Sequence, residues 1–219
     1  MVKSCFGSRE EKAEAFAAAD IYPVISSEFC MGRSPLDVFR AAAEGGAKLI
    51  QLREKHWNEK ALFDLAAACR PIANEYKVLL MIDDRVDVAL AANADGVHLG
   101  QDDLPVPAAR GLSEMLWIGN STHNLKEALR AQEEGADCIN IGPLFPTQTK
   151  EVGYDPLGLE LMKQVAAQIE VPFTVMGGIK ARHIPELVKA GVKHIAMVTE
   201  VTQAPDVAAK VRELRSLFR

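Results

Sequence analysis

The stretch IDDRVDVALAANADGVHLGQDD, residues 82–103, indicates a strand, a helix and a second strand in succession. Each apolar run leads into a pair of aspartates: Asp83 and Asp84 close the first, and Asp102 and Asp103 follow the second. Strand–helix–strand units of this kind are typical of parallel sheets in α/β proteins. Clustered carboxylates repel one another unless a cation offsets them, so the stretch also indicates a binding site.

The second half of this stretch belongs to a phrase that recurs along the chain. EGGAKLIQL starts at Glu44, ANADGVHL at Ala92, EEGADCINI at Glu133 and KAGVKHIAM at Lys189. Each phrase ends a polar, Ala-rich segment with a small or glycine-containing turn, which suits the end of a helix. The apolar run that follows fits a strand buried on both faces.

Extending this pattern over the chain predicts eight strands separated by amphipathic segments. The strands are IYPVIS near residue 21, KLIQL near 48, VLLMI near 78, GVHL near 96, LWIGNS near 116, DCINIG near 137, PFTVMG near 172 and HIAMVT near 194. Eight such units predict an α/β fold, a single-domain (β/α)8 TIM barrel over residues 21–219. An open doubly wound sheet is the alternative, but it usually stops at about five or six strands. Residues 1–20 are predicted to be an N-terminal extension, and the sequence does not decide whether it covers the bottom of the barrel.

The composition is that of a globular protein, with 219 residues, 48% of them hydrophobic, and a formal net charge of −5. This mild acidity, without a run of Lys or Arg, predicts no nucleic-acid partner. No apolar run approaches roughly 18 residues, so no membrane span is expected. The four cysteines form no C-x-x-C pair, which argues against a zinc site or a disulfide framework. We therefore expect a cytoplasmic protein, and the sequence leaves open whether it forms a homo-oligomer.

A barrel carries its active site at the C-terminal ends of its strands, and cations gather there. Gln51, Arg53 and Lys55 alternate along an extended segment and so share a face. The two cations suit a phosphorylated substrate, and the amide suits the edge of a heterocycle. The alternative is a surface ion pair with Glu54 or Asp84, which would contribute little.

The aspartates at the ends of neighbouring strands predict a metal site. Asp84 and Asp103 offer only oxygen ligands, which suit Mg²⁺ bound together with substrate phosphates. The alternative is that such aspartates cap the following helices, a role that Asp83 and Asp102 would fit. On balance the sequence favours the metal at Asp84 and Asp103.

Three further features lie at the ends of later strands. Gly177, Gly178 and Thr199 follow the seventh and eighth strands, where many barrels bind phosphate, although a Gly-Gly pair is more often only a turn. The loop PTQTKEVGYDP, starting at Pro146, is long enough to be a lid. His123 follows the fifth strand, and we expect it to be structural.

From about Ile21 onward the chain resembles the thiamine phosphate synthase family. The motifs that carry the resemblance are QLREK, DDR, ADGVHLGQDD, STH, GPLFPTQTK and GGI, in this order. The resemblance implies a transferase of thiamine biosynthesis, a thiamine-phosphate diphosphorylase. It would join 4-amino-5-hydroxymethyl-2-methylpyrimidine diphosphate to a thiazole phosphate and release pyrophosphate. The implied mechanism is dissociative: pyrophosphate leaves, a pyrimidine carbocation forms, and the thiazole nitrogen attacks it.

The resemblance also implies the roles of individual residues. The pyrimidine diphosphate would bind to Gln51, Leu52, Arg53, Glu54, Lys55, Asp83, Ser121 and Lys150. The thiazole phosphate would bind to Thr147, Gln148, Thr149, Gly178, Val198 and Thr199. Asp84 and Asp103 would bind Mg²⁺, and catalysis would rest on Arg53, Lys55, Lys150 and Ser121.

Four positions depart from the family pattern and bear on substrate affinity. Asp83 stands where the family usually has Asn, Met176 where a smaller or Ile-like residue is common, Thr199 in place of Ser, and Glu200 in place of a small residue. A carboxylate near a phosphate is unfavourable unless it points away. Two other functions therefore stay open. One is a thiazole tautomerase-like isomerase, which would need neither Mg²⁺ nor QLREK, DDR and GQDD; the other is a non-catalytic binder of a phosphorylated heterocycle.

Overall fold

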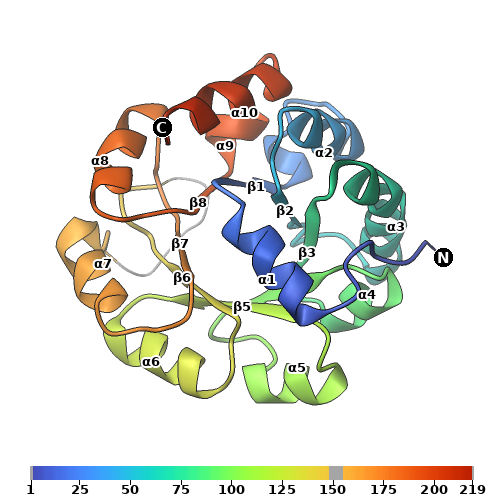
Figure 1. Ribbon diagram of the computed structural model, residues 1–219. Helices are drawn as coiled ribbons and strands as arrows, with labels where there is room; N and C mark the ends of the chain where they lie inside the picture. The colour runs from blue at the N-terminus through green and yellow to red at the C-terminus, as the bar shows by residue number, and fades with distance from the viewer. Residues whose placement is uncertain (1, 148–154, 219) are drawn as a thin grey trace.

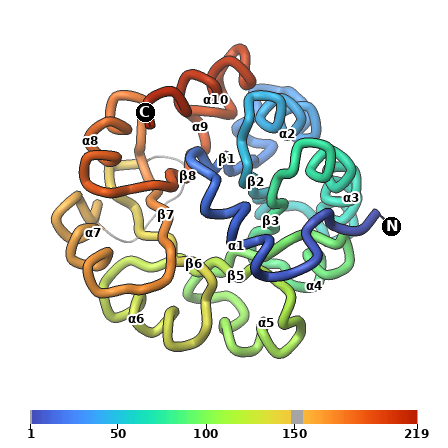
Figure 2. Tube along the Cα trace, viewed as in Figure 1, coloured from blue at the N-terminus to red at the C-terminus, as the bar shows by residue number. Residues whose placement is uncertain are grey.

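The computed structural model describes residues 2–147 and 155–218. Parallel strands close into a barrel in chain order, and β1 pairs with β8 to complete it (Figures 1 and 2). The strands are β1 (Ile21–Ile25), β2 (Leu49–Leu52), β3 (Leu79–Asp83), β4 (Gly96–Leu99), β5 (Trp117–Thr122), β6 (Cys138–Ile141), β7 (Phe173–Val175) and β8 (Ile195–Met197). The predicted TIM barrel is therefore confirmed.

Helices form a ring around the strands (Figure 1). They are α2 (Pro35–Glu44), α3 (Glu59–Tyr76), α4 (Val86–Ala91), α5 (Val106–Leu112), α6 (Leu125–Glu133), α7 (Gly158–Ala166), α8 (Ile184–Lys189) and α10 (Val207–Ser216). Short helical turns η1 (Ser27–Phe29), η2 (Ala181–His183) and α9 (Thr199–Thr202) lie in the connections after strands. Within residues 2–147 and 155–218, no helix is both long and apolar enough to cross a membrane.

The recurring turns have the backbone geometry that ends a helix. Gly46, Gly135 and Gly191 have φ angles of 96°, 89° and 90°, in the left-handed region that glycine adopts at low cost. Asn93 takes the same place in the phrase before β4, with φ of 54°. Each of these residues lies shortly after a helix and just before the next strand, so the local sequence sets the αβ connection.

Strand residues point alternately into the barrel and outward to the helices. The inward-pointing apolar cluster contains Leu49, Leu79, Met81, Trp117 and Cys138. The outward cluster contains Ile50, Leu52, Leu80, Ile82, Ile118 and Ile139. The same alternation carries a polar set into the interior nearer the C-terminal ends of the strands: Gln51, Asp83, His98, Ser121 and Asn140. The barrel therefore has an apolar lower interior and a polar mouth.

The N-terminal helix α1 (Arg9–Ala17) lies across the other end of the barrel, in front of the strands in Figure 1. Its Phe16 ring packs against Trp117 and His194, with ring centroids 5.3 Å and 4.6 Å away. Lys12 Nζ donates hydrogen bonds to the carbonyls of Asp95, at 3.0 Å, and Met115, at 2.6 Å. The extension thus closes the bottom of the barrel, opposite the mouth.

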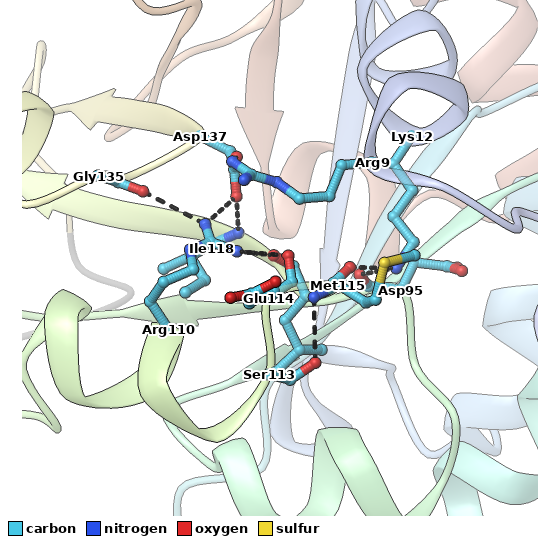
Figure 3. Close-up of polar contacts among 11 residues, drawn as sticks. Arg9, Lys12, Asp95, Arg110, Ser113, Glu114, Met115, Ile118, Gly135 and Asp137 are labelled. Carbon is cyan, nitrogen blue, oxygen red and sulfur yellow. Dashed lines mark hydrogen bonds and ion pairs between the residues drawn. The ribbon is translucent and has the colours of Figure 1, made fainter.

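Two aspartates that precede β4 and β6 tie this bottom together (Figure 3). Asp95 accepts a backbone hydrogen bond from β3 at 2.7 Å and pairs with Arg70, also at 2.7 Å. Asp137 does the same with β5, at 2.7 Å, and with Arg110, at 2.6 Å; Arg9 of α1 joins it. Both aspartates occupy the same place in the recurring phrase, so one local device is used twice.

Candidate active site

A hydrogen-bonded chain crosses the inside of the barrel from β1 to β3. The Tyr22 hydroxyl donates to Gln51 Oε1 at 2.6 Å, and Gln51 Nε2 donates to Asp83 Oδ1 at 2.5 Å. Gln51 is only 4% exposed and Asp83 only 9% exposed. Because a carboxylate only accepts and a hydroxyl here donates, the two neighbours fix which end of the Gln51 amide faces which way.

Asp83 also contacts the two predicted cations. Lys55 Nζ lies 2.9 Å from Asp83 Oδ2, and Arg53 Nε lies 3.6 Å from the same oxygen. Burial raises the pKa of the Asp83 carboxyl, although Lys55 and Arg53 oppose the rise. Burial favours the neutral amine of Lys55, yet Asp83 and Asp84 outweigh it and raise the Lys55 pKa. Both cations therefore reduce the cost of burying the Asp83 carboxylate, but burial remains the larger effect.

Asp84 and Asp103 lie together beside Lys55. Asp84 has a left-handed φ of 58° and pairs with Lys55, while Asp103 Oδ2 accepts a hydrogen bond from the Gly100 N–H at 2.6 Å. Burial raises the pKa of Asp103, and the neighbouring Asp84 carboxyl raises it further. Two adjacent carboxylates of this kind fit the needs of Mg²⁺, which usually takes one or two protein carboxylates plus phosphate and water. Among the described residues, no group of three or more His, Cys, Asp or Glu is arranged to hold a metal alone.

The alternative role of helix cap is wrong for Asp83 and Asp102. Helix α4 begins after Arg85 and α5 begins after Pro105, and no side chain caps the N-terminus of either helix. Asp102 is exposed, while Asp83 ends β3 inside the barrel.

His98 and Ser121 lie on neighbouring strands at the mouth. His98 Nε2 is 2.9 Å from Ser121 Oγ, which places the predicted catalytic hydroxyl beside an imidazole. A Cβ atom on Gly119 would lie 2.5 Å from His98 Nδ1, so only glycine leaves room for this ring. Asn140, on the next strand, donates to Thr174 Oγ1 at 2.6 Å. His123 Nδ1 lies 2.9 Å from Glu127 Oε2, a contact that suits its expected structural role.

A cavity of about 690 Å³ opens between the ends of β5, β6, β7 and β8. Its lining includes four residues predicted to bind the thiazole phosphate, namely Thr147, Gly178, Val198 and Thr199, as well as Ser121. Gly178 has φ of 63°, and a Cβ atom there would lie 2.3 Å from the Pro146 carbonyl oxygen. The glycine pair after β7 is thus required by close packing of two loops. The predicted residues Gln148, Thr149 and Lys150 lie outside the described part of the chain.

Two side chains of the QLREK segment do not join the cluster of cations and aspartates around Lys55. Leu52 packs in the core between barrel and helices. Glu54 is buried and accepts hydrogen bonds from Ser27 N and Ser27 Oγ, both at 2.7 Å. Glu54 therefore anchors the connection after β1, and burial raises its pKa while Ser27 opposes the rise.

Comparison with known proteins assigns the chain to a family. A family model described as thiamine monophosphate synthase matches residues 21–201. The chain belongs to the thiamine monophosphate synthase family.

Relatives of this family align with nearly the whole chain. A thiamine-phosphate synthase of Caldicellulosiruptor saccharolyticus is 37% identical, over 97% of this chain and 96% of that protein. One from Pelotomaculum thermopropionicum is 42% identical, over 91% and 92%. The solved thiamine phosphate pyrophosphorylase of Pyrococcus furiosus superposes with a TM-score of 0.83 and 35% identity, covering 91% of this chain and 95% of that one. The resemblance, the enzyme class and the predicted thiamine phosphate synthase function are thereby confirmed, while the dissociative mechanism and the use of Mg²⁺ stay predictions.

Some polar residues at the mouth of this thiamine monophosphate synthase family barrel were not predicted from the sequence. Gln51, His98 and Asn140 occupy the same place in three recurring phrases, so a lone polar residue in each apolar run was an available signal for the last two. Tyr22 had no such signal, because its partner Gln51 lies 29 positions away in the chain.

Proposed function

We propose that the chain joins the pyrimidine diphosphate to a thiazole phosphate and forms thiamine phosphate and pyrophosphate at the barrel mouth. The observation that carries this proposal is the position of Lys55, between Asp83 and Asp84 and beside Asp103. Cations and carboxylates packed together in this way suit a substrate with several negative charges and an accompanying metal ion.

This reaction depends on stabilising the departing pyrophosphate more than on proton transfer. The bond between the pyrimidine methylene carbon and the diphosphate oxygen breaks, and the electron pair leaves with pyrophosphate. The thiazole nitrogen then gives its lone pair to the methylene carbon. Arg53, Lys55 and Lys150 would stabilise the departing anion, and the Ser121 hydroxyl would donate a hydrogen bond to it. Gln51 would hold the pyrimidine, in the orientation that Tyr22 and Asp83 impose on its amide.

Asp84 and Asp103 would hold Mg²⁺. When bound there, the ion would add positive charge beside the leaving pyrophosphate. Lys55 keeps Asp83 as an ion-pair partner when Asp84 turns to the ion, because its ammonium contacts both carboxylates. This arrangement lets the site take up a metal without stranding a buried charge.

The cavity next to this cluster would receive the thiazole phosphate. Thr147, Gly178, Val198 and Thr199 line it, and Gln148 and Thr149 complete the predicted set. Phosphate sites in the loops after the seventh and eighth strands are common in TIM barrels. His98 lies between the cavity and the cation cluster, because it pairs in register with Asp83 and its Nε2 lies 2.9 Å from Ser121 Oγ at the cavity, so the two substrates would meet there.

Turnover separates this function from its alternatives. Purified protein with Mg²⁺ and both substrates is expected to release pyrophosphate and to form thiamine phosphate in equal amounts. Omitting the thiazole phosphate is the control for hydrolysis of the diphosphate. An isomerase would interconvert thiazole tautomers without pyrophosphate release, and a non-catalytic binder would retain both ligands without product; either result would sink the proposal.

Localisation and assembly remain predictions from the sequence. We expect a cytoplasmic protein that acts on small molecules, with neither a nucleic-acid nor a membrane partner. Cell fractionation and light scattering on the purified protein test the compartment and whether the chain forms a homo-oligomer.

A further inference from the structure

Lys180 and Glu200 connect the loops that follow β7 and β8. Lys180 Nζ lies 3.2 Å from Glu200 Oε2, and Glu200 Oε1 accepts a hydrogen bond from the Ala181 N–H at 3.1 Å. Both side chains line the 690 Å³ cavity, together with Gly178 and Thr199. A pair of opposite charges therefore stands where the phosphate of the thiazole substrate is proposed to bind.

Glu200 by itself would oppose that phosphate. It follows Thr199 directly, and its side chain is only 18% exposed, so water screens its charge incompletely. Its two oxygens are held by Ala181 and Lys180, which fixes the position of the carboxylate. Lys180 thus supplies a positive charge that offsets the Glu200 carboxylate.

Lys180 can do more than offset Glu200. Its side chain is 42% exposed and sits on a flexible four-carbon stem, so its ammonium can move within the cavity. An ammonium carries three N–H donors, and its ion pair with the single Glu200 oxygen leaves donors for another acceptor. The same group can therefore bond a phosphate oxygen while it remains paired with the carboxylate.

We propose that Lys180 is a phosphate-binding residue and that Glu200 is a positioning residue, which holds the Lys180 ammonium at the cavity. The inference rests on the proposed function, because it takes the cavity as the thiazole phosphate site. It adds a determinant of specificity: Lys180 makes the cavity prefer a phosphorylated thiazole over the corresponding thiazole alcohol.

Equilibrium binding tests the role of Lys180 without turnover. Isothermal titration calorimetry would compare thiazole phosphate and the thiazole alcohol on the unsubstituted protein, K180M, K180R, E200Q and the double variant K180M/E200Q. We expect K180M to weaken thiazole phosphate binding about tenfold, because a bond to a charged group is lost. Alcohol binding should change less than about twofold, and K180R should restore most of the phosphate affinity.

The double variant separates a phosphate ligand from a mere counter-charge. If Lys180 binds phosphate and Glu200 positions it, K180M/E200Q stays weaker than E200Q, but by roughly threefold rather than tenfold, because the ammonium is no longer held at the cavity. If Lys180 only offsets Glu200, the double variant binds as tightly as E200Q, and the inference is overturned. K163M is a matched control, because Lys163 pairs with Glu160 at 2.8 Å on α7 and is 49% exposed; it should bind both ligands like the unsubstituted protein.

The failure of this inference differs from a failure of the proposed function. Equal thiazole phosphate affinity in K180M and the unsubstituted protein, with pyrophosphate release intact in the latter, overturns only the role of Lys180. An unsubstituted protein that binds no thiazole phosphate overturns both. Circular dichroism of every variant shows that the barrel is intact, and the K180R comparison keeps the test decisive because it preserves the charge.

Discussion

Gln51 donates its side-chain amide hydrogen to Asp83 Oδ1 over 2.5 Å, inside a barrel where both residues are nearly inaccessible to solvent. This bond gives the buried carboxylate a hydrogen-bond donor. Asp83 binds the Gln51 amide through one oxygen and the Lys55 ammonium through the other. The Asp83 carboxylate is thus paired with a cation, and it also fixes the orientation of the Gln51 amide.

Removing the Tyr22 hydroxyl should loosen this orientation. Tyr22→Phe deletes the donor to Gln51 Oε1, and a hydrogen bond of this kind contributes about 0.5–1.5 kcal/mol. We expect the KM for the pyrimidine diphosphate to rise about threefold to tenfold, with kcat nearly unchanged. Steady-state kinetics checks this split. Tyr76→Phe, on α3 outside the barrel, is the control, and equal kinetics for both variants would contradict the role of Tyr22.

Neutralising Asp83 should tighten anion binding. Asp83→Asn removes a buried negative charge beside Lys55 and Arg53, so the two cations act more fully on a bound anion. We expect pyrophosphate, with Mg²⁺ present, to bind several-fold more tightly than to the unsubstituted protein, as titration calorimetry would measure. The exposed Asp102→Asn serves as the control. Weaker binding by Asp83→Asn would show that Asp83 contributes to the anion site in some other way.

Asp84 and Asp103 are expected to be needed for metal-dependent activity. Asp84→Ala and Asp103→Ala should each lower pyrophosphate release by at least about a hundredfold, because each removes one of the two proposed metal ligands. The Mg²⁺ concentration that gives half of the maximal remaining rate should rise. Thermal melts should resemble those of the unsubstituted barrel. Full activity in either variant would refute this assignment of the metal ligands.

A buried ion pair at the barrel bottom should contribute more to stability than an exposed pair elsewhere. Asp95 and Arg70 are fully buried, so Asp95→Ala strands a buried cation and should cost about 3–5 kcal/mol. That loss corresponds to a fall in Tm of roughly 10 °C for a chain of this size. Asp64→Ala breaks an exposed pair with Lys60 on α3 and should change stability by less than about 1 kcal/mol. Calorimetric melts that show equal losses would contradict the buried role.

The base of the barrel should weaken in acid through His194. Burial lowers the pKa of His194, whose ring packs on Phe16 and lies 2.6 Å from the Ala19 carbonyl oxygen. The unfolded chain therefore binds the proton more readily than the folded one. The contribution of neutral His194 to the free energy of unfolding is fully present above about pH 6.5 and declines as the pH falls below it. Denaturant melts from pH 7.5 to pH 5 should therefore show a steeper loss for the unsubstituted protein than for His194→Asn. The exposed His56→Asn should follow the unsubstituted protein; parallel curves for all three would contradict the prediction.

Much of the fold could be read from local patterns. The turns at Gly46, Gly135 and Gly191 end helices and precede strands, as the recurring phrase predicts. Strand parity also accounts for the inward position of Gln51 and Asp83, because alternate residues point to opposite faces. Parity did not reveal that Glu54 would turn to Ser27, since that contact depends on the connection after a different strand.

Local sequence is enough to predict the order of strands and helices, the family motifs and the set of polar residues at the strand ends, because these depend on residues near one another in the chain. Which of those residues touch depends on how the strands and loops pack in space. The parallel pairing of β1 with β2 brings Tyr22 to Gln51. The loops after β7 and β8 meet at the rim, which is how Lys180 comes to Glu200. A side-chain contact requires a distance in space, and the closed sheet sets that distance independently of separation along the chain.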